Sequence, residues 1–140
     1  MAQKIRQNLN FRQMKQFIMI FRNRTQQASV ESFSKEQMQT AMKEWQDWIT
    51  SIAATGNYIG TNRLFPEGKV IQQNIITDGG FAEGNIMVAG YLLVKANSLD
   101  EAVEMATKCP NLVYGLNVEV RSVMPIEFDV NSGNFLDIKN

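Results

Sequence analysis

Histidine is absent from the 140 residues of this chain, and cysteine occurs only once. The missing imidazole excludes Ser-His-Asp and Cys-His catalysis, zinc sites that use histidine, and a histidine-based pH switch. The single Cys109 excludes a disulfide within the chain and a zinc site built from several thiolates. No phosphate-cradling glycine motif is present either. We therefore expect neither a metal nor another cofactor.

Long apolar runs and an excess of charge are lacking as well. No stretch approaches the ~18 consecutive apolar residues that span a membrane, and the polar start of the chain does not resemble a signal peptide. Together with the lone cysteine, these features predict a cytoplasmic protein. The 14 basic and 14 acidic residues cancel, whereas nucleic-acid binding usually needs a basic excess. We expect no nucleic-acid or membrane partner.

The length and the 44% apolar content favour a single globular domain. Six Lys and Arg residues precede the first acidic residue, Glu31, so the beginning of the chain is basic. We divide the chain into an N-terminal basic arm (residues 1–13), a folded domain (residues 14–124) and an apolar C-terminal tail (residues 125–140). The arm is expected to be solvated or to pair with acids of the domain, and the tail to cover a sheet edge or a partner.

Apolar periodicity predicts four strands in the domain. Residues 17–21 and 87–96 are apolar on both faces, which is typical of central strands. Residues 70–77 and 118–124 alternate between apolar and polar side chains, which is typical of edge strands. A further short strand is predicted over residues 58–65.

Two helices separate these strands. The first begins at Ser34 and the second at Ser98, each followed three residues later by a Gln or Glu in the pattern of a capping box. Gly56 is suited to end the first helix in the left-handed conformation. The pair Cys109-Pro110 is expected to end the second, because the residue before proline avoids helical geometry.

This order predicts an α+β fold, the ferredoxin-like split β-α-β sandwich, with an antiparallel sheet and both helices on one face. The opposite face of the two central strands is still apolar. An exposed patch of that size is unusual on a monomer. The simplest cover is the same face of a second copy, related by a two-fold axis, so we predict a homodimer.

Four segments resemble one family when taken in order. Residues 75–83 read IITDGGFAE, residues 90–94 read GYLLV, residues 98–102 read SLDEA and residues 119–121 read EVR. In this order, over roughly residues 14–124, they resemble the YCII-related (DGPF) family. The resemblance implies a dimeric α/β barrel fold. Some members of this family are linked to small-molecule enzymology and others to sigma-factor-associated regulation. The His-Asp pair of the YCII branch cannot be carried over to a chain without histidine.

The glycine-rich loop of this motif provides three candidate ligand-binding residues: Asp78, Phe81 and Glu83. Asp78 is also a weak candidate for a catalytic residue, because a carboxylate held in such a loop can accept a proton or bind an amine or hydroxyl. In the alternative interpretation the segment is only a turn, and Asp78 bonds its own backbone.

Three residues outside the loop are further candidates. Arg121 can clamp an anion through paired hydrogen bonds, or it can form a surface ion pair with neighbouring Glu119. Trp45 can line a pocket or belong to the core. Tyr91 lies on a central strand, where a buried hydroxyl needs a partner. Cys109, at the expected end of the second helix, is predicted to be unreactive.

Two functions are compatible with these residues. In the first, the dimer encloses a pocket lined by Trp45, Tyr91 and Phe81 that binds a small organic molecule. This protein would be a binding protein or a cofactor-free enzyme, with Asp78 as the acid-base group and Arg121 as the anion clamp. In the second, the protein is a non-catalytic regulatory or assembly module that acts through protein partners, using the basic arm and the apolar tail.

Overall fold

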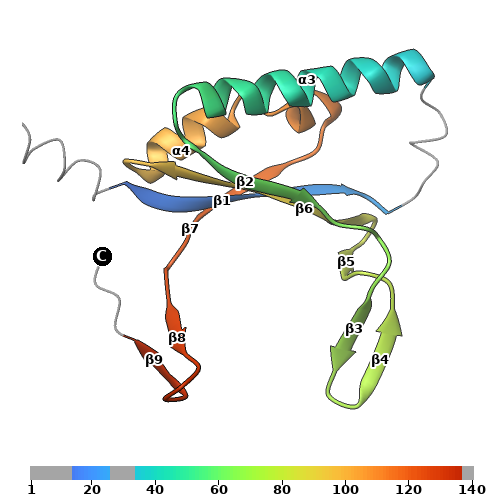
Figure 1. Cartoon of the computed structure of the whole chain (residues 1–140). Coiled ribbons are helices and arrows are strands. Elements are labelled where there is room, and N and C mark those ends of the chain that lie inside the picture. Colours follow the sequence, from blue (N-terminus) through green and yellow to red (C-terminus); the bar gives the residue numbers. More distant parts are fainter. Residues whose placement is uncertain (1–13, 26–33, 137–140) are drawn as a thin grey trace, which may run out of the picture.

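The computed structural model describes residues 14–25 and 34–136 (Figure 1). The predicted basic arm (residues 1–13) lies outside the described residues. In the described part, one sheet carries both α-helices on one side, while two hairpins project from the other side. No helix in this part is long and apolar enough to cross a membrane.

The main sheet is antiparallel, with the strand order β2-β6-β1-β7. These strands are β2 (Tyr58–Arg63), β6 (Ile86–Ala96), β1 (Lys15–Arg24) and β7 (Val118–Ser122). The short β5 (Ala82–Glu83) pairs with the beginning of β6. The helices are α3 (Lys35–Ala54) and α4 (Leu99–Ala106). The predicted ferredoxin-like α+β fold is therefore confirmed, with β1 and β6 as its central strands.

The helix ends follow the predictions in part. Ser34 forms a complete capping box with Gln37, and Gly56 after α3 adopts a left-handed φ of 79°. Ser98 accepts a hydrogen bond from the backbone N–H of Glu101, but the Glu101 side chain accepts from Asn97 instead. The second capping box is thus only half formed.

The end of the second helix differs from the prediction. α4 ends at Ala106, with Thr107 as its C-cap, before the chain reaches Cys109. Pro110 instead begins a 3-10 helix, η1 (Pro110–Tyr114). The missing proline N–H and its fixed φ suit the first turn of a new helix as well as they prevent the continuation of an old one.

The predicted edge strand over residues 70–77 is wrong. This segment forms a hairpin of its own, with strands β3 (Lys69–Gln72) and β4 (Ile75–Asp78). A two-residue loop reverses the chain, with Gln73 at a left-handed φ of 53°. Such loops usually contain glycine, so the polar pair at residues 73–74 did not signal a turn. β2 takes the predicted place at the edge of the sheet.

The hydrophobic core lies between the sheet and the helices. On β1, Phe17, Met19 and Phe21 are buried because alternate side chains point to the helix side. The other members of the core cluster come from the helices, β6 and Cys109: Trp48, Ile52, Leu92, Val94, Ala96, Ala102, Ala106 and Cys109.

The opposite side of the sheet, which we call the open face, has no helix over it (Figure 1). Its central positions are Ile18 and Ile20 of β1 and Tyr91 and Leu93 of β6, all half-buried. The β3–β4 hairpin projects beside one end of this face. A second hairpin, β8 (Glu127–Asp129) and β9 (Asn134–Leu136), projects beside the other.

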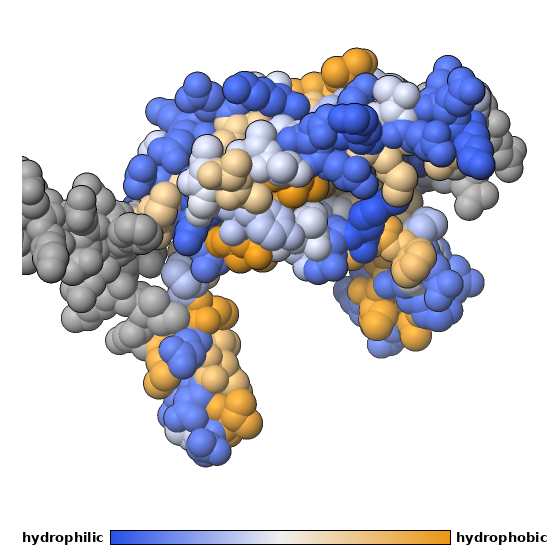
Figure 2. All heavy atoms as spheres, turned by 45° about the horizontal axis from the view of Figure 1, so that its top comes forward, coloured by the Kyte–Doolittle hydropathy of each residue, from blue (hydrophilic) through white to orange (hydrophobic). Residues whose placement is uncertain are grey.

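The second hairpin forms most of the predicted tail. In the described residues it stands away from the main sheet and does not cover a sheet edge of its own chain. Apolar residues gather on both hairpins (Figure 2). The most exposed of these large apolar side chains are Ile71, Ile75, Ile76, Phe128, Val130 and Phe135.

Candidate functional site

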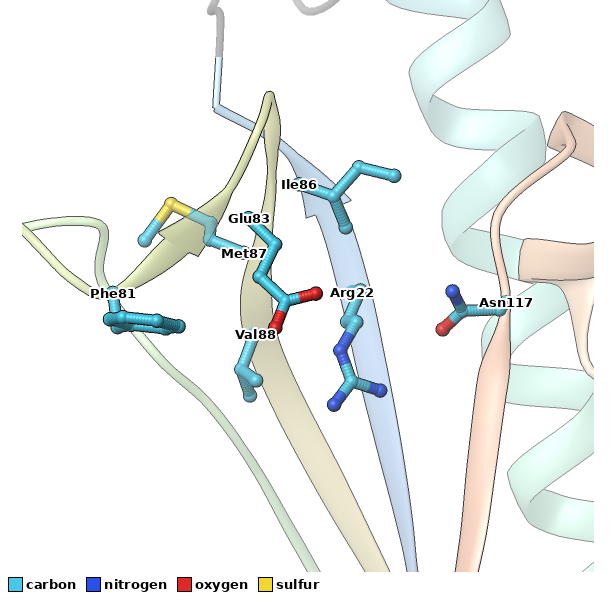
Figure 3. Close-up of a pocket in the computed structure, with 7 residues that line it drawn as sticks. All are labelled: Arg22, Phe81, Glu83, Ile86, Met87, Val88 and Asn117. Carbon is cyan, nitrogen blue, oxygen red and sulfur yellow. The ribbon is translucent and has the colours of Figure 1, made fainter.

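A half-open cleft of about 350 Å³ lies where β1 ends and β6 begins (Figure 3). Its volume falls in the range typical of small-ligand sites. The cleft combines apolar side chains with a guanidinium, a carboxylate and an amide. Its lining residues are Arg22, Phe81, Glu83, Ile86, Met87, Val88 and Asn117.

Local backbone features bring these side chains together. Arg22 directly follows a register shift between β1 and β6 and pairs with Val88. Buried Asn111 of η1 donates a hydrogen bond from its side chain to the Arg22 carbonyl at 3.1 Å, which anchors this end of β1. Across the cleft, the tight β5–β6 turn places Glu83 opposite Ile86 in register.

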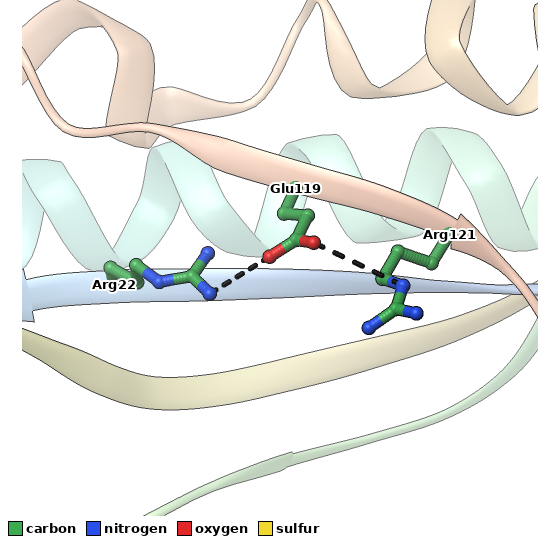
Figure 4. Close-up of polar contacts among 3 residues, drawn as sticks. All are labelled: Arg22, Glu119 and Arg121. Carbon is green, nitrogen blue, oxygen red and sulfur yellow. Dashed lines mark hydrogen bonds and ion pairs between the residues drawn. The ribbon is translucent and has the colours of Figure 1, made fainter. Parts of the chain in front are cut away.

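The charges on the open face form a short chain across two strands (Figure 4). The Arg22 Nη2 atom donates to Glu119 Oε1 at 2.8 Å, and the Arg121 Nε atom lies 4.0 Å from Glu119 Oε2. The Arg22 side chain is the least exposed of the three, at 28%. Two guanidinium groups around one carboxylate leave this cluster with a net charge of +1.

Asp78 and Arg121 are not brought together. Asp78 lies at the end of β4 on the projecting hairpin, where its carboxylate is 88% exposed and forms an ion pair with Lys69. Arg121 lies on β7 beside Glu119, and neither residue lines the cleft. A site that combines an acid-base Asp78 with an Arg121 clamp is therefore not formed within this chain.

Trp45 and Tyr91 lie on opposite sides of the sheet. The Trp45 ring packs edge-on against Phe21 and Trp48, with centroid distances of 4.9 and 5.5 Å, so it belongs with the core. Tyr91 points to the open face, where its hydroxyl accepts a hydrogen bond from Asn62 at 2.9 Å. Because the sheet separates the two rings, they do not line a common pocket within this chain.

Cys109 is buried directly before the 3-10 helix η1, as its N-cap residue, in agreement with the predicted unreactive thiol. Burial raises the pKa of its thiol from 9.0 to about 11, although a backbone hydrogen bond at Asn111 opposes this shift. We expect a thiol reagent to modify the folded protein near pH 8 far more slowly than the unfolded protein. A rate equal to that of the unfolded protein would contradict this assignment.

The same shift predicts a pH dependence of stability. A raised folded-state pKa means that the folded protein retains a proton that the unfolded chain loses. The contribution of the Cys109 thiol to the free energy of unfolding is therefore fully present below about pH 9 and is lost as the pH rises toward about 11. Urea unfolding should show the stability difference between wild type and Cys109→Ala shrinking over this interval. A constant difference would indicate an unshifted thiol.

Sequence reasoning found Phe81 and Glu83 but missed Arg22 and Asn117. The position of Arg22 in its strand could have indicated its orientation, since residues 18, 20 and 22 of a strand share one face. Asn117 gave no signal, because only the sheet pairing brings the beginning of β7 to the end of β1.

The sequence profile of the YCII-related domain family matches residues 16–127, which cover most of the chain. The chain belongs to this family. No curated protein matches it in a sequence comparison. In this YCII-related protein the cleft lies within the matched residues, whereas all but the first residue of the β8–β9 hairpin lies beyond them.

Proposed function

We propose that this YCII-related protein is a homodimer that binds a small organic molecule in the cleft beside its open face. The observation that carries the proposal is the combination of an uncovered apolar sheet face with a ligand-sized cleft on the same side. The family match itself names no ligand.

The open face supports a second copy as its cover. Its four central apolar side chains are only half-buried, although they occupy the two most central strands of the sheet. Contiguous apolar patches of this kind mark interaction sites. A two-fold related copy offers the same apolar surface in return and needs no further partner.

The two hairpins support the same arrangement. A two-stranded hairpin is marginally stable by itself in water and normally packs against another surface. On β8–β9, Phe128 and Phe135 stack edge-on at 5.1 Å while remaining 50% and 67% exposed. Both hairpins project past the open face, so a copy placed there would offer them a packing surface.

Binding is favoured over catalysis by the contents of the cleft. The proposed acid-base residue Asp78 is paired with Lys69 and does not line the cleft. Among the described residues that line the cleft, Glu83 is the single carboxylate, beside an arginine and an amide. A dimer that excludes water from the cleft would strengthen its electrostatic interactions with a ligand.

Sedimentation of the full chain tests the dimer. We expect a single species with the mass of two chains, twice 15.9 kDa, at micromolar concentration. A crystal structure with soaked fragments then tests the cleft, where bound density is expected beside Arg22. A monodisperse monomer, or a cleft filled by side chains of the second copy, would overturn the proposal.

The β8–β9 hairpin favours a second candidate function, a non-catalytic assembly module. Its exposed aromatic pair lies beyond the family match and is available to another protein. Hydrogen exchange on the dimer separates the candidates. Slow exchange at residues 127–136 indicates packing within the dimer, whereas fast exchange leaves the hairpin free to bind a different partner.

A further inference from the structure

The two sides of the cleft carry opposite charge. On one side lies the Arg22 guanidinium, which is paired with Glu119; Arg121, the second guanidinium near Glu119, does not line the cleft. On the other side lies Glu83, for which the described residues provide no hydrogen bond or ion pair. Figure 3 shows the Glu83 carboxylate directed across the cleft toward the Arg22 side chain.

Arg22 retains hydrogen-bonding capacity for a ligand. Its guanidinium has five N–H donors, and within the described chain the Arg22 side chain donates one hydrogen bond, to Glu119. The Asn117 amide lies on the same side of the cleft and adds a donor and an acceptor. This side is therefore suited to a carboxylate, which accepts paired hydrogen bonds from a guanidinium.

The remaining walls are apolar. Phe81 is 70% exposed, and Met87 and Val88 continue the surface toward the sheet. A bound molecule with a hydrocarbon or aromatic body would cover the Phe81 ring, which nothing in the described chain does. The cleft thus presents an anion site, a cation site and an apolar wall around one volume of about 350 Å³.

We propose that the cleft takes a small zwitterion with an apolar side chain, of the amino-acid class. Its carboxylate would bind Arg22 and Asn117, its ammonium group Glu83, and its side chain Phe81. This inference rests on the proposed binding function and specifies its ligand chemistry. A simple carboxylate would leave Glu83 without a partner, and a simple amine would leave the remaining Arg22 donors and the Asn117 amide unused.

Three matched probes test this assignment by titration calorimetry on protein whose dimeric state has been confirmed. L-phenylalanine carries both charges, 3-phenylpropanoate lacks the ammonium group and 2-phenylethylammonium lacks the carboxylate. We expect L-phenylalanine to bind at least about tenfold more tightly than either relative, because each missing group removes a charge-assisted hydrogen bond.

Glu83→Gln is the decisive variant, because its side chain is exposed and the change keeps its size. We expect it to weaken L-phenylalanine binding by about tenfold and to abolish the preference over 3-phenylpropanoate. Glu44→Gln is the matched control, because Glu44 lies on the exposed surface of α3 on the far side of the sheet. It should leave the affinity for all three probes unchanged.

The other outcomes distinguish failure of the zwitterion assignment from failure of the binding function. Equal binding of the three probes, or an effect of Glu44→Gln as large as that of Glu83→Gln, overturns the zwitterion assignment and leaves the binding function standing. Binding of none of them also overturns the assignment. The binding function itself fails when, in addition, fragment-soaked crystals show no density in the cleft.

Discussion

Trp48→Ala is expected to lower the free energy of unfolding by about 3–5 kcal/mol, which is the usual cost of removing a buried tryptophan. Trp48 is 6% exposed, and its ring packs edge-on against Phe21 and Trp45. Its Nε1–H donates to the Met105 carbonyl at 3.0 Å, joining the two helices. The variant therefore loses core volume and a contact between helices in one change.

The measurement is chemical unfolding followed by far-UV circular dichroism, at one protein concentration because dissociation of a dimer contributes to stability. Trp48→Phe keeps part of the buried area and should cost less. Met42→Ala, on the same helix but 60% exposed, is the matched control and should stay within about 0.5 kcal/mol of wild type. Equal losses for Trp48→Ala and Met42→Ala would place Trp48 outside the core.

Ile18→Lys is expected to raise the dissociation constant of the proposed homodimer by at least about 100-fold, because a buried unpaired charge costs several kcal/mol. Ile18 lies on the open face, in register with Leu93 on one side and Arg121 on the other. A lysine there adds a second positive charge beside Arg121. The two-fold axis places the change in both copies.

Sedimentation over a range of concentrations measures this effect. Ile18→Val keeps the face apolar and should remain dimeric, while Gln46→Lys adds the same charge to the exposed surface of α3. Circular dichroism should show that Ile18→Lys is still folded, because the side chain is only half-buried in a single chain and a lysine ammonium there can reach water. An unchanged dimer would show that the open face is not the interface.

The fold was predictable because its signals are local. Apolar residues on both faces identified β1 and β6 as central strands, and a capping serine located the beginning of each helix. These patterns follow from side-chain periodicity, which a sequence displays directly. The family match over residues 16–127 agrees with the motifs at residues 75–83 and 119–121.

The errors share a different cause. The sequence pattern predicts one strand where the β3–β4 hairpin lies, because the left-handed turn at Gln73 contains no glycine that would indicate it. Trp45 and Tyr91 were placed in one pocket, although the helix turns its apolar stripe toward the core and Tyr91 points to the other face. Each error concerns which side of the sheet a residue faces or where the chain reverses.

The sequence by itself determined the α+β class, the two central strands and the absence of histidine chemistry. It also indicated Phe81 and Glu83, because both lie in one short motif. Only the tertiary structure decided that Arg22 and Asn117 join them, while Asp78 lies apart on a hairpin. The reason is physical: periodicity is a property of neighbouring residues, whereas a site depends on strand register between segments almost a hundred residues apart.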